Sequence, residues 1–224
     1  MNVLVTGGAG YIGSHVVHEL LKEKINVTIL DNLSTSCKEN INKDVNFIYG
    51  DILNESILNK TIKEHKIEAV IHLAALKAAG ESMINPSKYL NNNLIGSSKL
   101  IMSCQKNNID KIIFSSSAAV YGEPKENPIT EFHSTMPTNF YGETKLQIER
   151  YLEWYKKLHK INYVSLRYFN AAGYNQNGIL KKVDYNPQNL IPIIMEVLTN
   201  KRKVLEVFGI DYNTNDGTAI RDYV

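Results

Sequence analysis

A glycine-rich turn near the N-terminus constrains the fold of this chain more than any other feature. The turn spans residues 7–13 and meets the spacing G-x-G-x-x-G from Gly8 onward. It follows a short run of β-forming residues at 2–6, and helical periodicity begins after Gly13. Glycines in such a turn let the backbone approach a pyrophosphate, whose charge the amides of the following helix can bind. The stretch therefore predicts a strand, a phosphate-binding turn and a helix.

A carboxylate at the end of the next predicted strand indicates which dinucleotide the turn would hold. Residues 27–30 are apolar or β-branched and lead directly into Asp31. A carboxylate here accepts hydrogen bonds from both ribose hydroxyls and repels a 2′-phosphate, and 32–36 contain no arginine to bind one. The sequence favours NAD over NADP, and a glycine-rich turn without a ligand is the weaker alternative.

Apolar strands and amphipathic helices alternate along most of the chain. Further strands are predicted at 45–49, 69–73, 111–114 and 163–167, with helices through 57–62, 86–105 and 141–145. This alternation predicts an α/β fold with a doubly wound parallel sheet, an NAD-binding Rossmann fold, whose ligands bind outside the carboxyl ends of the strands. His72 lies inside a predicted buried strand and is interpreted as a packed core residue.

The alternating pattern weakens after Asn170. A helix at 189–200 and a strand at 204–208 are expected there, and a new β-type run begins at 221, shortly before the sequence stops. We expect an NAD-binding Rossmann domain at 1–172 that carries the candidate catalytic residues. The remainder, 173–224, is expected to be the start of a truncated, incomplete substrate-binding domain.

The composition argues against several classes of function. Of the 224 residues, 43% are hydrophobic and 21% charged, and the net charge is +2. Such a charge provides no basic field for nucleic acid. The apolar runs are of strand length and no signal-peptide pattern opens the chain, so we expect a cytoplasmic protein without a membrane partner. Cys37 and Cys104 are too few and too far apart for a disulfide framework or a metal site, so structural thiols and no metal are expected.

The stretch from Tyr141 to Lys145 contains the candidate catalytic residues. Residues four apart on a helix project from the same face, so the phenol and the ammonium can share one pocket. The positive charge favours the phenolate, but lowering the pKa of Tyr141 by about three units requires roughly 4 kcal/mol, more than one solvated lysine supplies. Ser117 is a candidate additional donor and an oxidised nicotinamide ring a candidate cation. An ordinary amphipathic helix with an exposed lysine is the alternative.

Short motifs along the whole chain match one known family. They occupy 3–15, 30–34, 50–52, 72–77, 80–82, 115–122, 167–170 and 216–218. Together they resemble the extended short-chain dehydrogenase/reductases. The glycine-rich turn and Y-x-x-x-K mark this superfamily as a whole. Residues 75–82 are closer to its UDP-sugar 4-epimerases.

The resemblance, with the glycine motif, implies a cofactor site and a sugar-nucleotide site. The implied NAD contacts are Gly7, Gly10, Tyr11, Ile12, Gly13, Asp31, Asn32, Leu33, Ser34, Thr35, Ser36, Asp51, Ile52, Leu73, Ala74, Ala75, Leu76, Lys77, Asn92, Lys145 and Phe169. The implied substrate contacts are Ser117, Tyr141, Asn170, Asn189, Phe208 and Arg221. Asn189 could equally cap a helix, and Phe208 could equally be a core aromatic.

The implied reaction interconverts UDP-galactose and UDP-glucose. Tyr141 takes the proton of the sugar 4-hydroxyl, directly or through Ser117, while hydride passes from C4 to NAD; the 4-keto sugar then turns over and is reduced on its other face. The resemblance also suggests a homodimer through the helix before Ser115 and the helix bearing Tyr141, although the long apolar face that this needs could equally be intramolecular core.

Two other functions stay open at this point. One is another NAD-dependent sugar-nucleotide epimerase, dehydratase or decarboxylase, although Ala118 and Ala119 occupy the place beside Ser117 where a dehydratase would need an acid–base pair. The other is a non-catalytic NAD-binding module.

Overall fold

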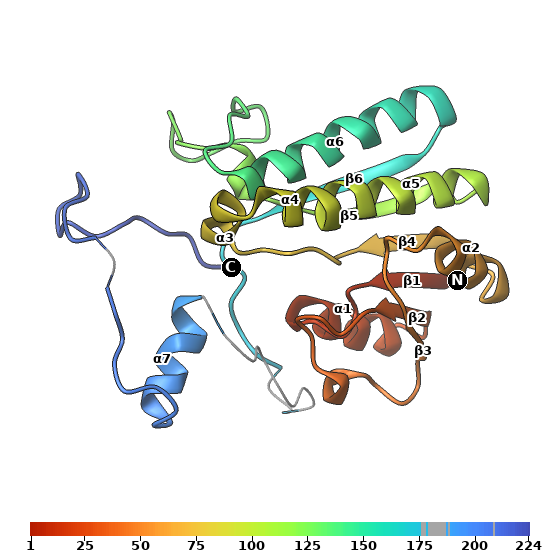
Figure 1. Ribbon diagram of the computed structural model, residues 1–224, viewed down its shortest axis with the longest axis horizontal. Coiled ribbons are helices and arrows are strands. Elements are labelled where there is room, and N and C mark those ends of the chain that lie inside the picture. Colours follow the sequence, from red (N-terminus) through yellow and green to blue (C-terminus); the bar gives the residue numbers. More distant parts are fainter. Residues whose placement is uncertain (176–177, 179–186, 188, 208) are drawn as a thin grey trace.

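The described part of the chain is built around a six-stranded parallel sheet (Figure 1). The computed structural model describes residues 1–175, 178, 187, 189–207 and 209–224. The strands are β1 (Asn2–Thr6), β2 (Asn26–Asp31), β3 (Asn46–Tyr49), β4 (Ala69–His72), β5 (Lys111–Ser117) and β6 (Asn162–Tyr168). They lie in the order β3-β2-β1-β4-β5-β6. The order reverses between β1 and β4, which confirms the predicted doubly wound sheet and places a ligand crevice at that point.

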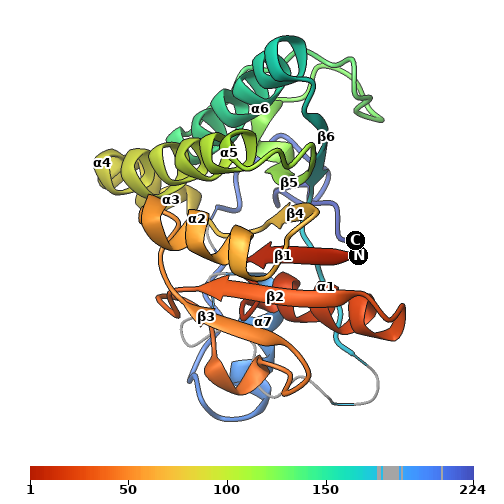
Figure 2. The same cartoon turned by 90° about the vertical axis from the view of Figure 1, so that its right-hand side faces the viewer.

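Helices cover both faces of this sheet. They are α1 (Tyr11–Lys22), α2 (Glu55–Glu64), α3 (Ala79–Ile84), α4 (Pro86–Tyr89), a π-helical segment η2 (Leu90–Ile95), α5 (Gly96–Lys106), α6 (Phe140–His159) and α7 (Leu190–Leu198), with short 3₁₀ turns η1 (Lys38–Asn40) and η3 (Ala118–Val120). Apolar side chains of α2, α5 and α6 share one core cluster, and those of α1 belong to a second. Figure 2 shows α5 and α6 stacked side by side along the same side of the sheet.

The central strands are buried on both faces because consecutive side chains point into different cores. In β1, Leu4 belongs to the cluster beneath α2, α5 and α6, whereas Val3 and Val5 belong to the cluster beneath α1. None of these three is more than 1% exposed. A strand covered on both sides gains from apolar residues at every position, which explains the near-continuous apolar runs in the sequence.

Local sequence signals explain where the main helices begin and end. The Asn139 side chain caps α6 by accepting from the Gly142 amide at 2.8 Å, and the helix ends at Lys160 in the left-handed region. Asn54 caps α2 in the same way through the Ile57 amide, at 3.2 Å. Such caps satisfy amides that have no partner within the helix.

Three boundaries differ from the sequence expectation. Helix α1 begins at Tyr11, ahead of Gly13, because the last glycine of the motif packs inside the first helical turn. Strand β5 continues through the serines to Ser117, since β6 pairs with it along its whole length. The helix expected over 86–105 consists of α4, η2 and α5 in succession.

The strand expected at 204–208 is wrong for residues 204–207, which have no regular structure. Val204 and Val207 are exposed and have no neighbouring strand within the described residues, and an unpaired strand leaves its backbone groups unsatisfied. Phe208 lies outside the described residues. The β-type run near 221 appears as one parallel bridge between Asn170 and Tyr223.

The region after β6 is held less firmly than the sheet. Helix α7 has no buried residue although its sequence is almost entirely apolar. Figure 1 shows it standing apart from the layer formed by α3 to α6. Within the part of the chain that the structure describes, no helix has both the length and the apolar character needed to span a membrane.

Candidate active site

The glycine turn lies directly against the end of β4. Gly7 adopts φ +74°, and a Cβ there would come within 2.7 Å of the Ala74 amide nitrogen. A Cβ on Gly13 would overlap the Gly7 carbonyl oxygen. The Gly10 amide closes the turn by donating to that same carbonyl at 3.2 Å. Only residues without a side chain permit this approach, which leaves the first amides of α1 facing the crevice between β1 and β4.

Asp31 joins the glycine turn to the loop that follows β2. Its carboxylate accepts from the Ala9 amide at 3.0 Å, the Leu33 amide at 2.8 Å and the Ser36 hydroxyl at 2.7 Å. A carboxylate has about four acceptor positions, so roughly one remains for a ribose hydroxyl. The site therefore fits an NAD ribose. From the sequence alone, Asp31 is expected to accept from both ribose hydroxyls, but its carboxylate has room for about one of them.

The loop after β3 lies beside the loop after β2 at the same edge of the sheet. Asn32 donates to the Asp51 carboxylate at 2.8 Å, which brings together two predicted cofactor residues from different strands. Asp51 also accepts from the Leu53 amide at 2.8 Å. An open cavity of about 530 Å³ lies beside the loop and is lined by Leu33, Ser36, Lys38 and Glu39.

Asn93 holds the loop after β4, a role that the sequence analysis missed. Its Oδ1 accepts from the Leu76 amide at 2.8 Å, and its Nδ2 donates to the Leu76 carbonyl at 2.9 Å and to Thr144 Oγ1 at 3.3 Å. The predicted cofactor residue Asn92 is adjacent and donates to Asn93 at 3.0 Å. A run of three asparagines inside a predicted helix was the available signal, because asparagine is a poor helix former.

The three candidate catalytic residues converge at the carboxyl end of β5. Lys145 donates from Nζ to the Ser115 carbonyl at 2.7 Å, and its Nζ lies 5.8 Å from the centre of the Tyr141 ring. The Ser117 side chain acts on the pKa of the Tyr141 phenol and accepts from the Ala119 amide at 3.2 Å. The structure thus brings together a half-buried phenol, a half-buried hydroxyl and a buried ammonium.

Burial dominates the titration of this group. It raises the pKa of the Tyr141 phenol, and the Ser117 hydrogen bond offsets only part of that rise. It also lowers the pKa of Lys145 to about 7, against which the Glu149 carboxylate acts. The expectation of a Tyr141 pKa lowered by its neighbours is wrong for the chain alone, because desolvation of the phenolate outweighs them. Because the chain alone raises the pKa of Tyr141, a further cation is needed to favour the phenolate.

A buried ion pair, Glu149–Arg167, lies one helical turn beyond Lys145. Arg167 donates to Glu149 through Nε at 3.0 Å and through Nη2 at 2.7 Å, and the Ser116 hydroxyl donates to the same carboxylate. The guanidinium lies 4.8 Å above the centre of the Tyr121 ring. The sequence analysis did not identify this pair, although the spacing of Tyr141, Lys145 and Glu149 continues one helix face.

His72 is held between two hydroxyl groups in the core. Its Nδ1 is 2.7 Å from Thr6 Oγ1, and its Nε2 is 2.7 Å from Ser97 Oγ. Burial, assisted by the charge of Lys145, lowers the pKa of His72 to about 3. This neutral, enclosed imidazole confirms the interpretation of His72 as a packed core residue.

The two cysteines are buried, as expected of structural thiols. Burial raises the pKa of Cys104 to about 12, so its thiol stays protonated at neutral pH. Within the described residues, no group of three or more histidine, cysteine, aspartate or glutamate side chains could hold a metal ion.

The predicted substrate residues after β6 lie in a more open setting. The Asn170 amide group donates to the Asp222 carbonyl at 2.7 Å, and Arg221 donates to the carbonyl of its neighbour Ile220 at 2.8 Å. Asn189 is exposed at the N-cap position of α7 and makes no side-chain cap bond. Phe208 lies outside the described residues, so neither of its two expected roles is tested.

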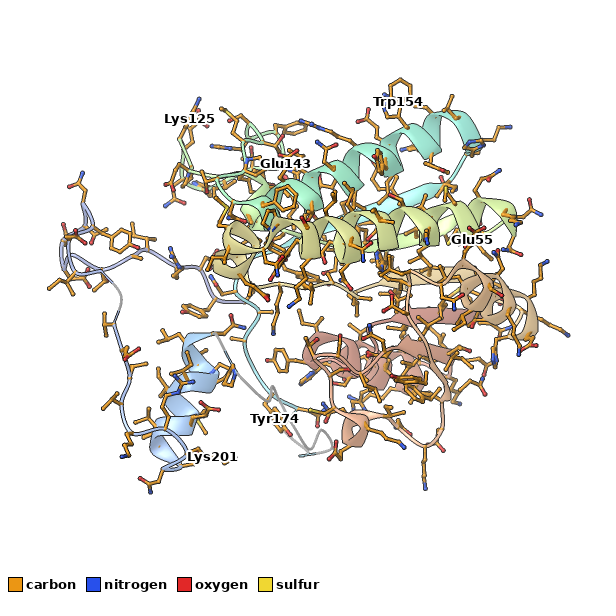
Figure 3. All side chains as sticks on the ribbon, viewed as in Figure 1. Glu55, Lys125, Glu143, Trp154, Tyr174 and Lys201 are labelled. Carbon is orange, nitrogen blue, oxygen red and sulfur yellow. The ribbon has the colours of Figure 1, made fainter. Side chains whose placement is uncertain are left out.

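The segment after β6 returns to the first helix. The Tyr11 hydroxyl donates to the Gly173 carbonyl, and the Tyr174 ring lies edge-on to His15, with 6.0 Å between ring centres. Figure 3 shows Tyr174 on the side of α1. Residues 173–174 therefore lie close to the N-terminal end of α1, next to the glycine turn.

The site agrees with one family of enzymes over nearly the whole sequence. The model of the NAD dependent epimerase/dehydratase family matches residues 3–224. The chain belongs to this family.

Individual members of the epimerase/dehydratase family are similar along the entire chain. The UDP-glucose 4-epimerase of Halalkalibacterium halodurans is 46% identical over 225 aligned positions, which cover 100% of this chain and 67% of that protein. The UDP-glucose 4-epimerase of Bacillus subtilis is 45% identical, with 100% and 69% covered. These shares show that the chain spans about two thirds of the length of such relatives.

Solved structures of the family have the same fold. The crystal structure of UDP-glucose 4-epimerase from Brucella ovis in complex with NAD superimposes with a TM-score of 0.95 at 42% identity, covering 100% of this chain and 68% of that one. That of Bifidobacterium longum UDP-glucose 4-epimerase with NAD+ and UDP also gives 0.95, at 40% identity, with 100% and 70% covered.

Proposed function

We propose that this chain interconverts UDP-galactose and UDP-glucose as a UDP-glucose 4-epimerase. The observation that carries the proposal is the group of Tyr141, Ser117 and the buried Lys145 at the carboxyl end of β5, on the same edge of the sheet as the glycine turn. Relatives of that name at 42% to 46% identity support it. In doubly wound sheets, this edge is where a dinucleotide and its substrate meet.

Each member of the group has a separate role. Tyr141 exchanges a proton with the sugar 4-hydroxyl, directly or through the hydroxyl of Ser117, which acts on the pKa of the phenol. Lys145 supports the phenolate and would bind the nicotinamide ribose. Its side chain is shielded from water, because Lys145 is only 3% exposed. NAD, when bound, accepts the hydride from sugar C4 and returns it to the other face.

The residues at the other strand ends would hold the cofactor. The amides at the start of α1 would bind the pyrophosphate, Asp31 a ribose hydroxyl, and Asp51 with Ile52 the adenine. The loop 73–77, fixed by Asn93, would border the nicotinamide side. Asn170, Asn189, Phe208 and Arg221 are proposed to hold the UDP part. No acid–base side chain stands beside Ser117 in η3, which consists of Ala118, Ala119 and Val120, so elimination of water is disfavoured.

The division of the chain follows its core. We propose a cofactor-binding, catalytic domain over 1–172 and the beginning of a substrate-binding domain over 173–224. The buried hydrophobic residues of the described chain extend only as far as Ile161. Contacts after β6 are made mainly through the backbone, as between Asn170 and Val224.

A homodimer in the cytoplasm is proposed as the working form. Several large apolar side chains on the outer surface of η2, α5 and α6 are exposed, namely Ile95, Met102, Tyr151, Trp154 and Leu158. Figure 3 shows Trp154 pointing away from the body of the protein. A second copy of this face would cover these side chains. Light scattering of the chain and of Trp154→Glu tests this, because a dimer through this face should dissociate in the variant.

The function is tested by proton NMR of the sugar anomeric signals. The purified chain is incubated with NAD and UDP-galactose, and UDP-glucose is expected to appear until both sugars reach equilibrium. Omission of the chain is the blank. A chain that binds NAD, as followed by quenching of Trp154 fluorescence, yet leaves UDP-galactose unchanged would overturn the proposal.

A further inference from the structure

The Glu149–Arg167 pair is the most enclosed ion pair in the described part of the chain. The side chain of Glu149 is 10% exposed and that of Arg167 22%. Two parallel hydrogen bonds hold the guanidinium on the carboxylate. Removing both charges from water is expensive, and apolar residues of similar size often stabilise a fold equally well. A role beyond stability is therefore worth seeking for this pair.

The position of the pair connects it to the catalytic group. Glu149 follows Lys145 by four residues and Tyr141 by eight, so all three lie on one face of α6. This face packs on the serine-bearing end of β5, where Ser115 accepts from Lys145 and Ser116 donates to Glu149. Arg167 lies opposite Ser116 in the strand register and completes the connection to β6.

The groups around the Lys145 ammonium come from three elements. From β5 it meets the Phe114 ring, 4.9 Å away, and the Ser115 carbonyl. On β4, the imidazole of His72 lies within reach of its charge. From its own helix it lies 5.8 Å from the centre of the Tyr141 ring, and the Glu149 carboxylate one turn further along acts on its charge. Glu149 is the anion among these groups, and Arg167, on β6, holds it.

We propose that Glu149, held by Arg167, is a positioning residue for the proton relay: it maintains the charge that Lys145 carries beneath Tyr141 and fixes the serine-bearing end of β5 against α6. The inference rests on the proposed function for its kinetic consequence. The pKa of Lys145 supports it independently, because burial lowers that pKa to about 7 and Glu149 opposes the change. Without the carboxylate, that pKa would fall further, and a smaller fraction of Lys145 would be charged at neutral pH.

The direct test is the titration of Lys145 by carbon NMR at Cε, assigned by the signal that Lys145→Arg removes. In Glu149→Gln, which keeps the shape and loses the charge, we expect the Lys145 titration to shift down by about one pH unit. The matched control is Glu153→Gln, one turn further along α6, because Glu153 is exposed and pairs only with Lys157, at 2.6 Å. The control should leave Lys145 unchanged. A folded Glu149→Gln with an unshifted Lys145 would overturn the proposal.

The kinetic test is the pH profile of epimerisation. The active form needs a charged Lys145. In Glu149→Gln, the lower pKa of Lys145 should therefore move the alkaline limb of the kcat profile to lower pH by about one unit. The KM for the sugar nucleotide should change little. A purely structural role would lower the amount of active protein at every pH and leave the limb in place, which would also overturn the proposal. Glu153→Gln should superimpose on the unchanged chain.

A second variant and a measurement without substrate separate failure of this proposal from failure of the proposed function. If Glu149→Gln does not fold, Glu149→Asp retains the charge but withdraws it from Arg167 and Ser116. The Lys145 titration should then shift down by about half a unit, and no shift would count against the proposal. If the chain shows no epimerisation, the proposed function fails while the NMR titration, which needs no substrate, still decides the role of Glu149.

Discussion

The two parts of the candidate site differ in how their side chains are held. Around β5 and α6, Lys145, Ser116 and Glu149 are buried, and each has hydrogen-bond partners on another element. After β6, Asn189 and Arg221 are exposed, and the Arg221 side chain donates to the backbone carbonyl of its neighbour Ile220. The Tyr141 group and the glycine turn are thus arranged in advance by the core, whereas Asn189 and Arg221 are not. Substitutions in the first part should have large and local effects.

The largest effect is expected from Tyr141→Phe, which removes the proton-exchanging hydroxyl and keeps the ring packed. General acid–base groups contribute roughly 10²- to 10⁴-fold, so kcat should fall by about that factor. The anomeric NMR assay measures it, and fluorescence titration should show NAD binding within about twofold of the unchanged chain.

Tyr151→Phe is the matched control, because Tyr151 lies on the same helix but is partly exposed and makes no part of the relay. Its activity should be unchanged. Equal losses in the two variants would remove the distinction between the buried face of α6 and its outer face.

A second effect compares the two faces of α6 for stability. Leu152 is fully buried in the main core, whereas Leu158 is 68% exposed. Leu152→Ala should lower the free energy of unfolding by about 2–5 kcal/mol, through lost burial and the cavity left behind. Leu158→Ala should change it by less than about 0.5 kcal/mol. Urea denaturation followed by circular dichroism measures both, and similar losses would contradict the core assignment.

The same contrast explains what the sequence could and could not predict. Strands such as 2–6 could be predicted because a strand covered on both faces is apolar at every position. The position of Asp31 at a strand end could be predicted because it directly follows such a strand. The Glu149–Arg167 pair could not be predicted, since it depends on β6 lying beside β5, which no local pattern encodes. The direction of the Tyr141 pKa depends on how deeply the fold buries it. The strand expected at 204–208 failed at 204–207 because pairing requires a neighbour, not only apolar residues.

A third prediction uses the titration of Lys145 as a measure of burial. Its pKa of about 7 in the folded chain lies below the ordinary lysine value of 10.5, so between these values the unfolded chain binds the additional proton. The free energy of unfolding should therefore rise with pH from about 7 toward 10, by on the order of a few kcal/mol. Urea denaturation across this range should show the rise in the unchanged chain and not in Lys145→Met. A rise of equal size in the variant would mean that another group causes it.

The smallest effect concerns the glycine turn, where two alanine substitutions separate packing from helix propensity. A Cβ at Gly13 would overlap the Gly7 carbonyl oxygen, whereas one at Gly80, in α3, would meet nothing within 4 Å. Gly13→Ala should cost about 1–3 kcal/mol of stability through overpacking, and NAD binding should weaken as the turn moves from the end of β4. Gly80→Ala should be neutral or stabilising by up to about 1 kcal/mol, because alanine favours the helix. Thermal unfolding with and without NAD measures both terms, since a ligand that binds only the folded chain raises its melting temperature. If Gly13→Ala kept the full NAD-induced rise, the close approach of the turn to β4 would not be what shapes the cofactor site.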